Sequence, residues 1–120
     1  MLTATEMQLK SSTVGKARSL SEGLGLTQDD VAEILKVQPR SVLRWWSGET
    51  TPRRVSQRLL REFAYVLGEL SKVLRPEAAK TWLLTPNRRL QHDSPADRIA
   101  DGDYREVLAL IEALADGVVM

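Results

Sequence analysis

The sequence predicts an all-α protein, and three observations support this class. Apolar residues recur at the three- and four-residue spacing of amphipathic helices, while no segment alternates as a half-buried strand does. Several segments open on Ser or Thr with an acidic residue three positions later, or on proline, which are helix start signals. Glycines and prolines separate these segments. A chain of 120 residues has room for one ordinary domain or for two small subdomains that share a core.

The first predicted elements are a frayed end and two short helices. Residues 1–12 are polar, without caps or a clear period, and are expected to fray. A helix near 13–24 ends at a pair of glycines. The next helix has strong start signals, because Thr27 is a good N-cap and Asp30 can complete a capping box. Its apolar stripe is Val31, Ile34 and Leu35.

A tight turn over residues 36–38 leads into another short helix. Pro39 suits the first position of that helix, where the missing N–H of proline is not needed. Val42 and Leu43 are expected to face inward, and Gly48 is expected to end the helix.

Two short helices joined in this way are typical of a helix-turn-helix, which presents its second helix to the major groove of DNA. In that groove Gln pairs with adenine and Arg with guanine, each giving ~1–3 kcal/mol of discrimination. We expect Trp45 in the core, and Trp46 at the surface against phosphate or a partner. The predicted DNA contacts are Gln28, Gln38, Arg40, Ser41, Arg44, Arg53 and Arg54.

Charge is distributed unevenly along the chain, although its net value is only +1. Seven basic residues stand against one acid between residues 36 and 61, and seven acids stand against two basic residues from residue 93 onward. Clustered arginines beside a recognition helix favour salt-dependent phosphate contacts. We expect such contacts from Arg53 and Arg54, which open the next helix. Arg58 and Arg61 are equally compatible with a solvated surface.

A long helix is predicted over residues 52–74, with Thr51 as its N-cap. It has more apolar positions than one side of a small DNA-binding unit needs. The surplus requires cover from the C-terminal half or from a second copy, and a homodimer suits a protein that reads two half-sites. The apolar positions are Val55, Leu59, Leu60, Phe63, Val66, Leu67, Leu70, Val73 and Leu74.

Three further helices are predicted in the C-terminal half. Pro76 ends the long helix and opens another over 76–84. Ser94 is the N-cap of a short helix, with a proline and an acidic residue in its first turn, and residues 104–115 form the last helix. Residues 118–120 are an apolar tail that needs a burial site, either on its own core or on a partner.

The composition excludes several functional classes. The chain has no cysteine, which excludes disulfide scaffolds and Cys-ligated zinc, and His92 is its single histidine, so no metal site is expected. No nucleophile–base pair, carboxylate dyad or phosphate-binding glycine loop is recognisable, so we expect neither an enzyme nor a cofactor. No apolar run approaches the ~20 residues that span a bilayer, and no signal-peptide core is present, so we expect a cytoplasmic protein.

Residues 26–48 resemble the Xre-type helix-turn-helix, except that the family usually has glycine in place of Lys36. The C-terminal half is similar to the toxin-binding domain of Xre/MbcA/ParS antitoxins, with the MbcA branch nearest, and the two modules follow that family's order. The first module matches at Leu26, Thr27, Gln28, Val31, Ala32, Leu35, Val37, Val42, Trp45 and Gly48. The second matches at Trp82, Leu83, Pro86, Asn87, Leu90, Pro95, Asp97, Gly102, Tyr104, Val107, Leu110, Leu114 and Gly117.

This resemblance implies a type II antitoxin with an Xre-like domain over 13–74 and a toxin-binding domain over 75–120. Its partner would be a RES-domain toxin that degrades NAD, and the antitoxin would block the NAD pocket and repress its own operon. An acidic segment with an apolar tip complements the electropositive pocket that an anionic dinucleotide requires. The predicted toxin contacts are Asp101, Asp103, Tyr104, Glu112, Asp116, Gly117, Val118, Val119 and Met120. A solvated acidic surface is the alternative interpretation.

Two other functions stay open at this point. One is a plain helix-turn-helix repressor whose C-terminal half only dimerises or senses a ligand. The other is an interaction scaffold with an inactive DNA-binding motif. A neighbouring gene for a small RES-type enzyme would favour the antitoxin, with a toxin–antitoxin hetero-oligomer as its assembled form.

Overall fold

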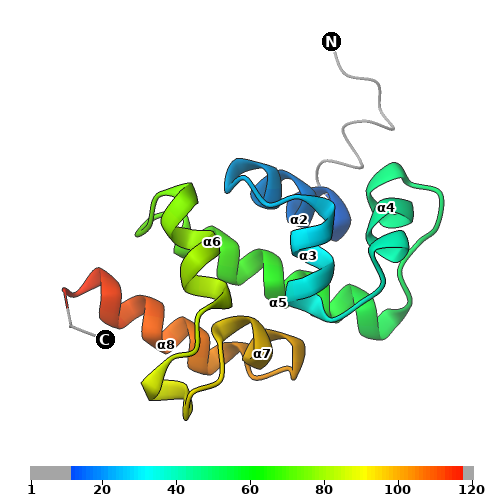
Figure 1. The fold of residues 1–120 in the computed structure, drawn as a ribbon. Coiled ribbons are helices and arrows are strands. Elements are labelled where there is room, and N and C mark those ends of the chain that lie inside the picture. Colours follow the sequence, from blue (N-terminus) through cyan, green and yellow to red (C-terminus); the bar gives the residue numbers. More distant parts are fainter. Residues whose placement is uncertain (1–11, 118–120) are drawn as a thin grey trace.

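The computed structural model describes residues 12–117, and all regular structure in this range is helical. This confirms the predicted all-α class. Figure 1 shows the arrangement of the helices. The elements are α2 (Thr13–Gly23), α3 (Gln28–Leu35), α4 (Pro39–Ser47), α5 (Arg54–Leu70), α6 (Pro76–Leu84), the 3₁₀ helix η1 (Arg88–Leu90), α7 (Pro95–Ala100) and α8 (Tyr104–Ala115).

Helix α5 forms the centre of the molecule. Its residues Leu60, Phe63 and Leu67 are 0% exposed, and each such side chain contributes roughly 1.5–3 kcal/mol through burial. Helix α2 packs on one side of α5 and α8 on the other, while α3 packs against both α4 and α7 (Figure 1). One hydrophobic core therefore includes residues of both halves. The division into 13–74 and 75–120 stays a prediction about sequence modules.

Two reciprocal capping boxes fix the starts of α3 and α7, as their sequences predict. Thr27 Oγ1 accepts a hydrogen bond from the Asp30 N–H at 3.1 Å, and Asp30 Oδ2 accepts one from the Thr27 N–H at 2.9 Å. Ser94 and Asp97 form the same pair of hydrogen bonds, at 3.1 and 3.0 Å. Replacing a cap of this kind by alanine costs about 1 kcal/mol of stability.

The turn between α3 and α4 explains why glycine is usual at its first position. Lys36 has a left-handed backbone with a φ of 56°, a region in which a side chain is disfavoured. Gly48 ends α4 with a φ of 80°, as predicted. Helices α6 and α8 have the predicted bounds, 76–84 and 104–115.

Helix α5 is shorter than predicted. It spans Arg54–Leu70 rather than 52–74, and its N-cap is Arg53 rather than Thr51. Pro52 is buried in the preceding loop, where its carbonyl accepts a hydrogen bond from Gln57 Nε2 at 3.0 Å. Val55 is 81% exposed instead of inward, because the buried stripe of α5 begins only at Leu60.

The two chain ends fall outside the described range. The predicted fraying concerns residues 1–12, of which only Ser12 is described, and the predicted contacts Val118, Val119 and Met120 are not described. Between residues 12 and 117, no helix combines the length and the apolar character needed to cross a membrane.

Candidate functional site

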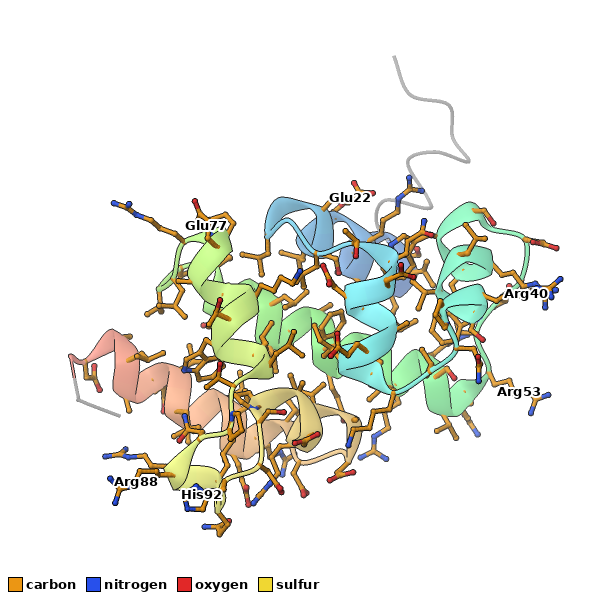
Figure 2. All side chains as sticks on the ribbon, viewed as in Figure 1. Glu22, Arg40, Arg53, Glu77, Arg88 and His92 are labelled. Atoms are coloured by element: carbon orange, nitrogen blue, oxygen red, sulfur yellow. The ribbon has the colours of Figure 1, made fainter. Side chains whose placement is uncertain are left out.

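Helix α4 carries the predicted base-reading side chains on its solvent side. Gln38 is the N-cap residue of α4 and is exposed, as is Arg40, while Ser41 and Arg44 are half-buried. Figure 2 shows the Arg40 side chain directed away from the core. Arg44 Nε lies 4.0 Å from Oε2 of Glu49, and the two side chains are 40% and 65% exposed. This geometry suits side chains that exchange water for an anionic partner.

The start of α5 extends the same cationic area. Arg53 and Arg54 are exposed, and Figure 2 places Arg53 at the same end of the molecule as Arg40, also pointing outward. We call Arg40, Arg44, Arg53 and Arg54 the basic surface. Gln28, the first residue of α3, is exposed as well. DNA contact by all of these residues stays a prediction.

For two apolar residues of α4, the predictions of burial and exposure were wrong. Trp46 was predicted at the surface and is 7% exposed, whereas Leu43 was predicted inward and is 51% exposed. The 3.6-residue period places Val42, Trp45 and Trp46 on one face, so Leu43 falls outside the buried face. Arg18 Nη1 donates a hydrogen bond to the Trp46 carbonyl at 2.8 Å, which joins α2 to α4. Trp46 is therefore a core residue.

The acidic residues predicted to contact a toxin lie on α8, in the loop before it and at its C-cap. The exposed ones are Asp101, Asp103, Glu112 and Asp116. Tyr104 is half-buried and packs against the core, with the Arg105 guanidinium 6.0 Å from its ring centroid. Gly117 is exposed and has a φ of 78°. The four acids are thus accessible to a partner, while Tyr104 is accessible only in part.

Arg98 joins the segments of the C-terminal half, a role that the sequence analysis missed. Its side chain is 13% exposed and forms ion pairs with Asp93, at 3.0 Å, and with Glu106. It also donates hydrogen bonds to the Leu90 carbonyl at 2.8 Å and to Gln91 Oε1 at 2.7 Å. The hydrogen bond to Asp93 raises the pKa of Arg98 further above its already high ordinary value. Arg98 thereby connects the η1 segment to α7 and α8, and its positive charge compensates the negative charge of Glu106.

Two ion pairs connect the N-terminal and C-terminal helices. Lys36 Nζ lies 3.0 Å from Asp97 Oδ1, and Lys80 Nζ lies 3.1 Å from Asp30 Oδ1. Each aspartate uses its other oxygen to complete a capping box. We call these two pairs the interhelical ion pairs.

Both aspartates of the interhelical ion pairs have a lowered pKa. For Asp97 the main cause is the hydrogen bond from the backbone of its N-cap residue, followed by the one from Lys36. For Asp30 burial acts to raise the pKa, but the hydrogen bonds from its N-cap residue and from Lys80 together outweigh burial. Both carboxylates are therefore charged at neutral pH.

Two adjoining hollows lie between α5 and α8, with volumes of about 410 and 490 Å³. Both are lined by Tyr65, Arg105 and Leu108, and Tyr65 is 57% exposed. In the second hollow Arg58 Nε lies 3.3 Å from Glu62 Oε2, and the Arg58 side chain is 78% exposed while that of Glu62 is 12% exposed. Within residues 12–117, no buried side-chain nitrogen or oxygen lacks a hydrogen-bond partner, and no His, Cys, Asp and Glu cluster could hold a metal ion.

Comparisons with known proteins extend over most of the chain. Residues 65–117 match the model of the antitoxin Xre/MbcA/ParS C-terminal toxin-binding domain. The mycobacterial cidal antitoxin MbcA of Mycobacterium tuberculosis is 47% identical over 97 residues, which cover 81% of this chain and 86% of that protein. A probable mycobacterial cidal antitoxin of the same species is 33% identical over 93 residues, covering 78% of this chain and 79% of that protein.

The fold has a counterpart among solved structures. A chain of the crystal structure of the Mycobacterium tuberculosis MbcT–MbcA toxin–antitoxin complex matches with a TM-score of 0.78 and 43% sequence identity. The match covers 89% of this chain and 96% of that chain. These findings confirm the resemblance that the sequence motifs indicated. The chain belongs to the MbcA branch of the Xre/MbcA/ParS antitoxin family.

Proposed function

We propose that this chain neutralises a RES-domain, NAD-degrading toxin by binding over the NAD pocket, and that it represses its own operon through α4. The observation that supports this most strongly is the likeness to a chain of the MbcT–MbcA complex, which extends over both halves of the molecule. The proposed inhibition is by occlusion and needs no catalysis by this chain.

The charge of the C-terminal half supports the proposed mode of inhibition. NAD carries phosphates, so a pocket that binds it must be electropositive, and exposed carboxylates complement such an opening. Asp101, Asp103, Glu112 and Asp116 are all exposed, on α8 or directly before or after it. The apolar residues 118–120 follow directly and would add a tip that can be buried in the pocket.

The arrangement of the two surfaces supports the proposed repression. Arg40 and Arg53 of the basic surface lie at one end of the molecule (Figure 2), and the last turn of α8 lies at the other end (Figure 1). The molecule measures 45 Å along its longest axis. DNA and toxin can therefore occupy separate surfaces of one antitoxin. Two copies would read two half-sites about 34–36 Å apart, so we propose a homodimer within a larger toxin–antitoxin assembly in the cytoplasm.

Reconstitution with the neighbouring gene product tests the inhibition. Full-length antitoxin is mixed with the purified enzyme, and NAD consumption is followed together with complex formation by size exclusion. We expect a stable complex and loss of NAD consumption. Deletion of residues 118–120, or Glu112→Gln with Asp116→Asn, should restore NAD consumption at antitoxin concentrations that silence the toxin when the antitoxin is intact.

A control variant separates a local effect from a general one. Arg88→Gln with Arg89→Gln changes two exposed charges on η1 and should leave inhibition intact. Absence of any complex with the neighbouring enzyme would favour the plain repressor, whose C-terminal half only dimerises or senses a ligand. Full inhibition by the truncated chain would move the blocking contact to earlier residues.

A further inference from the structure

Leu43 is an exposed leucine among the arginines of α4. It is 51% exposed, although its neighbour Val42 is 0% exposed. At about 100° per residue, Leu43 lies about 60° from Arg40 around the helix axis, and Arg44 lies about 40° from Arg40 on the other side. The solvent side of α4 therefore combines one branched apolar side chain with two guanidinium groups. This combination suits a partner that offers anionic, hydrogen-bonding and apolar groups together.

We propose that Leu43 is a specificity-determining residue that contacts the C5-methyl group of a thymine in the major groove. The inference rests on the proposed DNA-binding function. The major groove presents guanine acceptors to arginine, and its apolar group is the thymine methyl. Leucine forms no side-chain hydrogen bond, so its favourable contact with a base edge is apolar, and the thymine methyl is the apolar group that the major groove offers. The position of Leu43 beside Arg40 and Arg44 favours DNA over an apolar protein partner, because the same surface is cationic.

The expected contribution of this contact is modest and measurable. Burying one methyl group is worth about a fourfold change in affinity. Deoxyuridine differs from thymidine only by that methyl group and keeps the O4 acceptor and the base pairing. Replacing the contacted thymine by deoxyuridine should therefore weaken binding of the unmodified protein about fourfold. Other thymines in the protected region should show no such dependence.

The experiment uses the full-length chain and the DNA fragment that it protects upstream of its own gene. Each thymine of the protected region is replaced in turn by deoxyuridine, and dissociation constants are measured for the unmodified protein and for Leu43→Ala. We expect the thymine preference at one position per half-site to disappear in Leu43→Ala. Arg40→Ala should bind this fragment more weakly but keep the preference for thymine over deoxyuridine at that position.

Val55→Ala is the matched control. Val55 is 81% exposed but lies on the first turn of α5, so its truncation should leave the thymine preference unchanged. Equal affinity for thymine and deoxyuridine at every position, or a preference that persists in Leu43→Ala, overturns the proposal while DNA binding itself stands. Loss of toxin binding in Leu43→Ala with unchanged DNA affinity overturns it in favour of a protein contact. Absence of DNA binding at any salt concentration removes the underlying repressor function and the proposal together.

Discussion

The salt dependence of DNA binding tests the basic surface quantitatively. The double variant Arg53→Gln/Arg54→Gln removes two exposed charges at the start of α5, and neither side chain caps the helix. Surface changes of this kind alter the free energy of unfolding by about 0.5 kcal/mol or less. The slope of log Kobs against log salt is negative, and each lost phosphate contact reduces its magnitude by about 0.9, so the double variant should reduce it by about 1.8.

This difference in slope converts into a large difference in affinity. A rise from about 50 to 200 mM salt is a fourfold change, so a slope smaller by about 1.8 corresponds to a factor of about twelve. Over that range the unmodified protein should lose about twelve times more affinity than the double variant. Fluorescence anisotropy titrations on the upstream DNA fragment at several salt concentrations give both slopes.

A control of equal charge makes the result specific to the basic surface. Arg88→Gln/Arg89→Gln removes the same net charge from η1, and Figure 2 shows Arg88 at the other end of the molecule from Arg53. This variant should keep the slope of the unmodified protein. If both double variants lowered the slope equally, net charge rather than direct phosphate contact would set the salt dependence, and the reasoning would be refuted.

Three other predictions address single groups. Arg40→Ala should relax base preference at one operator position, measured by competition with altered sites, and an equal loss on all sequences would contradict its place in the groove. Lys36→Gly and Lys36→Ala both remove the ion pair to Asp97, but only glycine relieves the left-handed backbone, so the glycine variant should melt about 5 °C higher than the alanine variant. A glycine variant that melts lower would contradict this strain argument. The lowered pKa values of Asp30 and Asp97 contribute stability that is present above the unfolded pKa of about 3.9 and is lost as pH falls through the folded values. Urea unfolding between about pH 5 and pH 3 should show this fall, and Asp30→Asn/Asp97→Asn should reduce it; an equally steep fall in that variant would assign the effect to other groups.

Short-range signals in the sequence predicted most element boundaries. The capping boxes at Thr27 and Ser94 each involve residues three positions apart, so the pattern that forms them is visible in the sequence. Gly48 ends α4 for an equally local reason, its left-handed backbone. The predicted start of α5 was wrong because the Thr51-Pro52 pair is compatible with an N-cap at Thr51, two residues before the observed N-cap Arg53. Burial of Pro52 in the loop decided between them.

Long-range contacts and the choice between adjacent apolar residues were not predictable in the same way. Val42 with Leu43, and Trp45 with Trp46, each offer two neighbouring apolar side chains, and the packing of α4 against α3 and α2 decides which of them are buried. Arg98 has partners on three segments, and a count of charges does not identify them. Asp101, Asp103, Glu112 and Asp116, which were predicted as toxin contacts, are all exposed, as that role requires.

The interhelical ion pairs bear on how the two halves act together. Lys36 stands in the turn that positions α4, and its partner Asp97 stands in the first turn of α7. Lys80 of α6 pairs in return with Asp30, which caps α3. Asp30 also completes the capping box of α3, and Asp97 that of α7. A shift of one half of the molecule would therefore disturb a capping box in the other half. The shared core and these two pairs therefore favour a single rigid body. In such a body α4 keeps a fixed orientation relative to the C-terminal end of α8, where Glu112 and Asp116 lie. If the proposed toxin contact at α8 and DNA contact at α4 both hold, toxin binding would leave the position of α4 within the antitoxin unchanged.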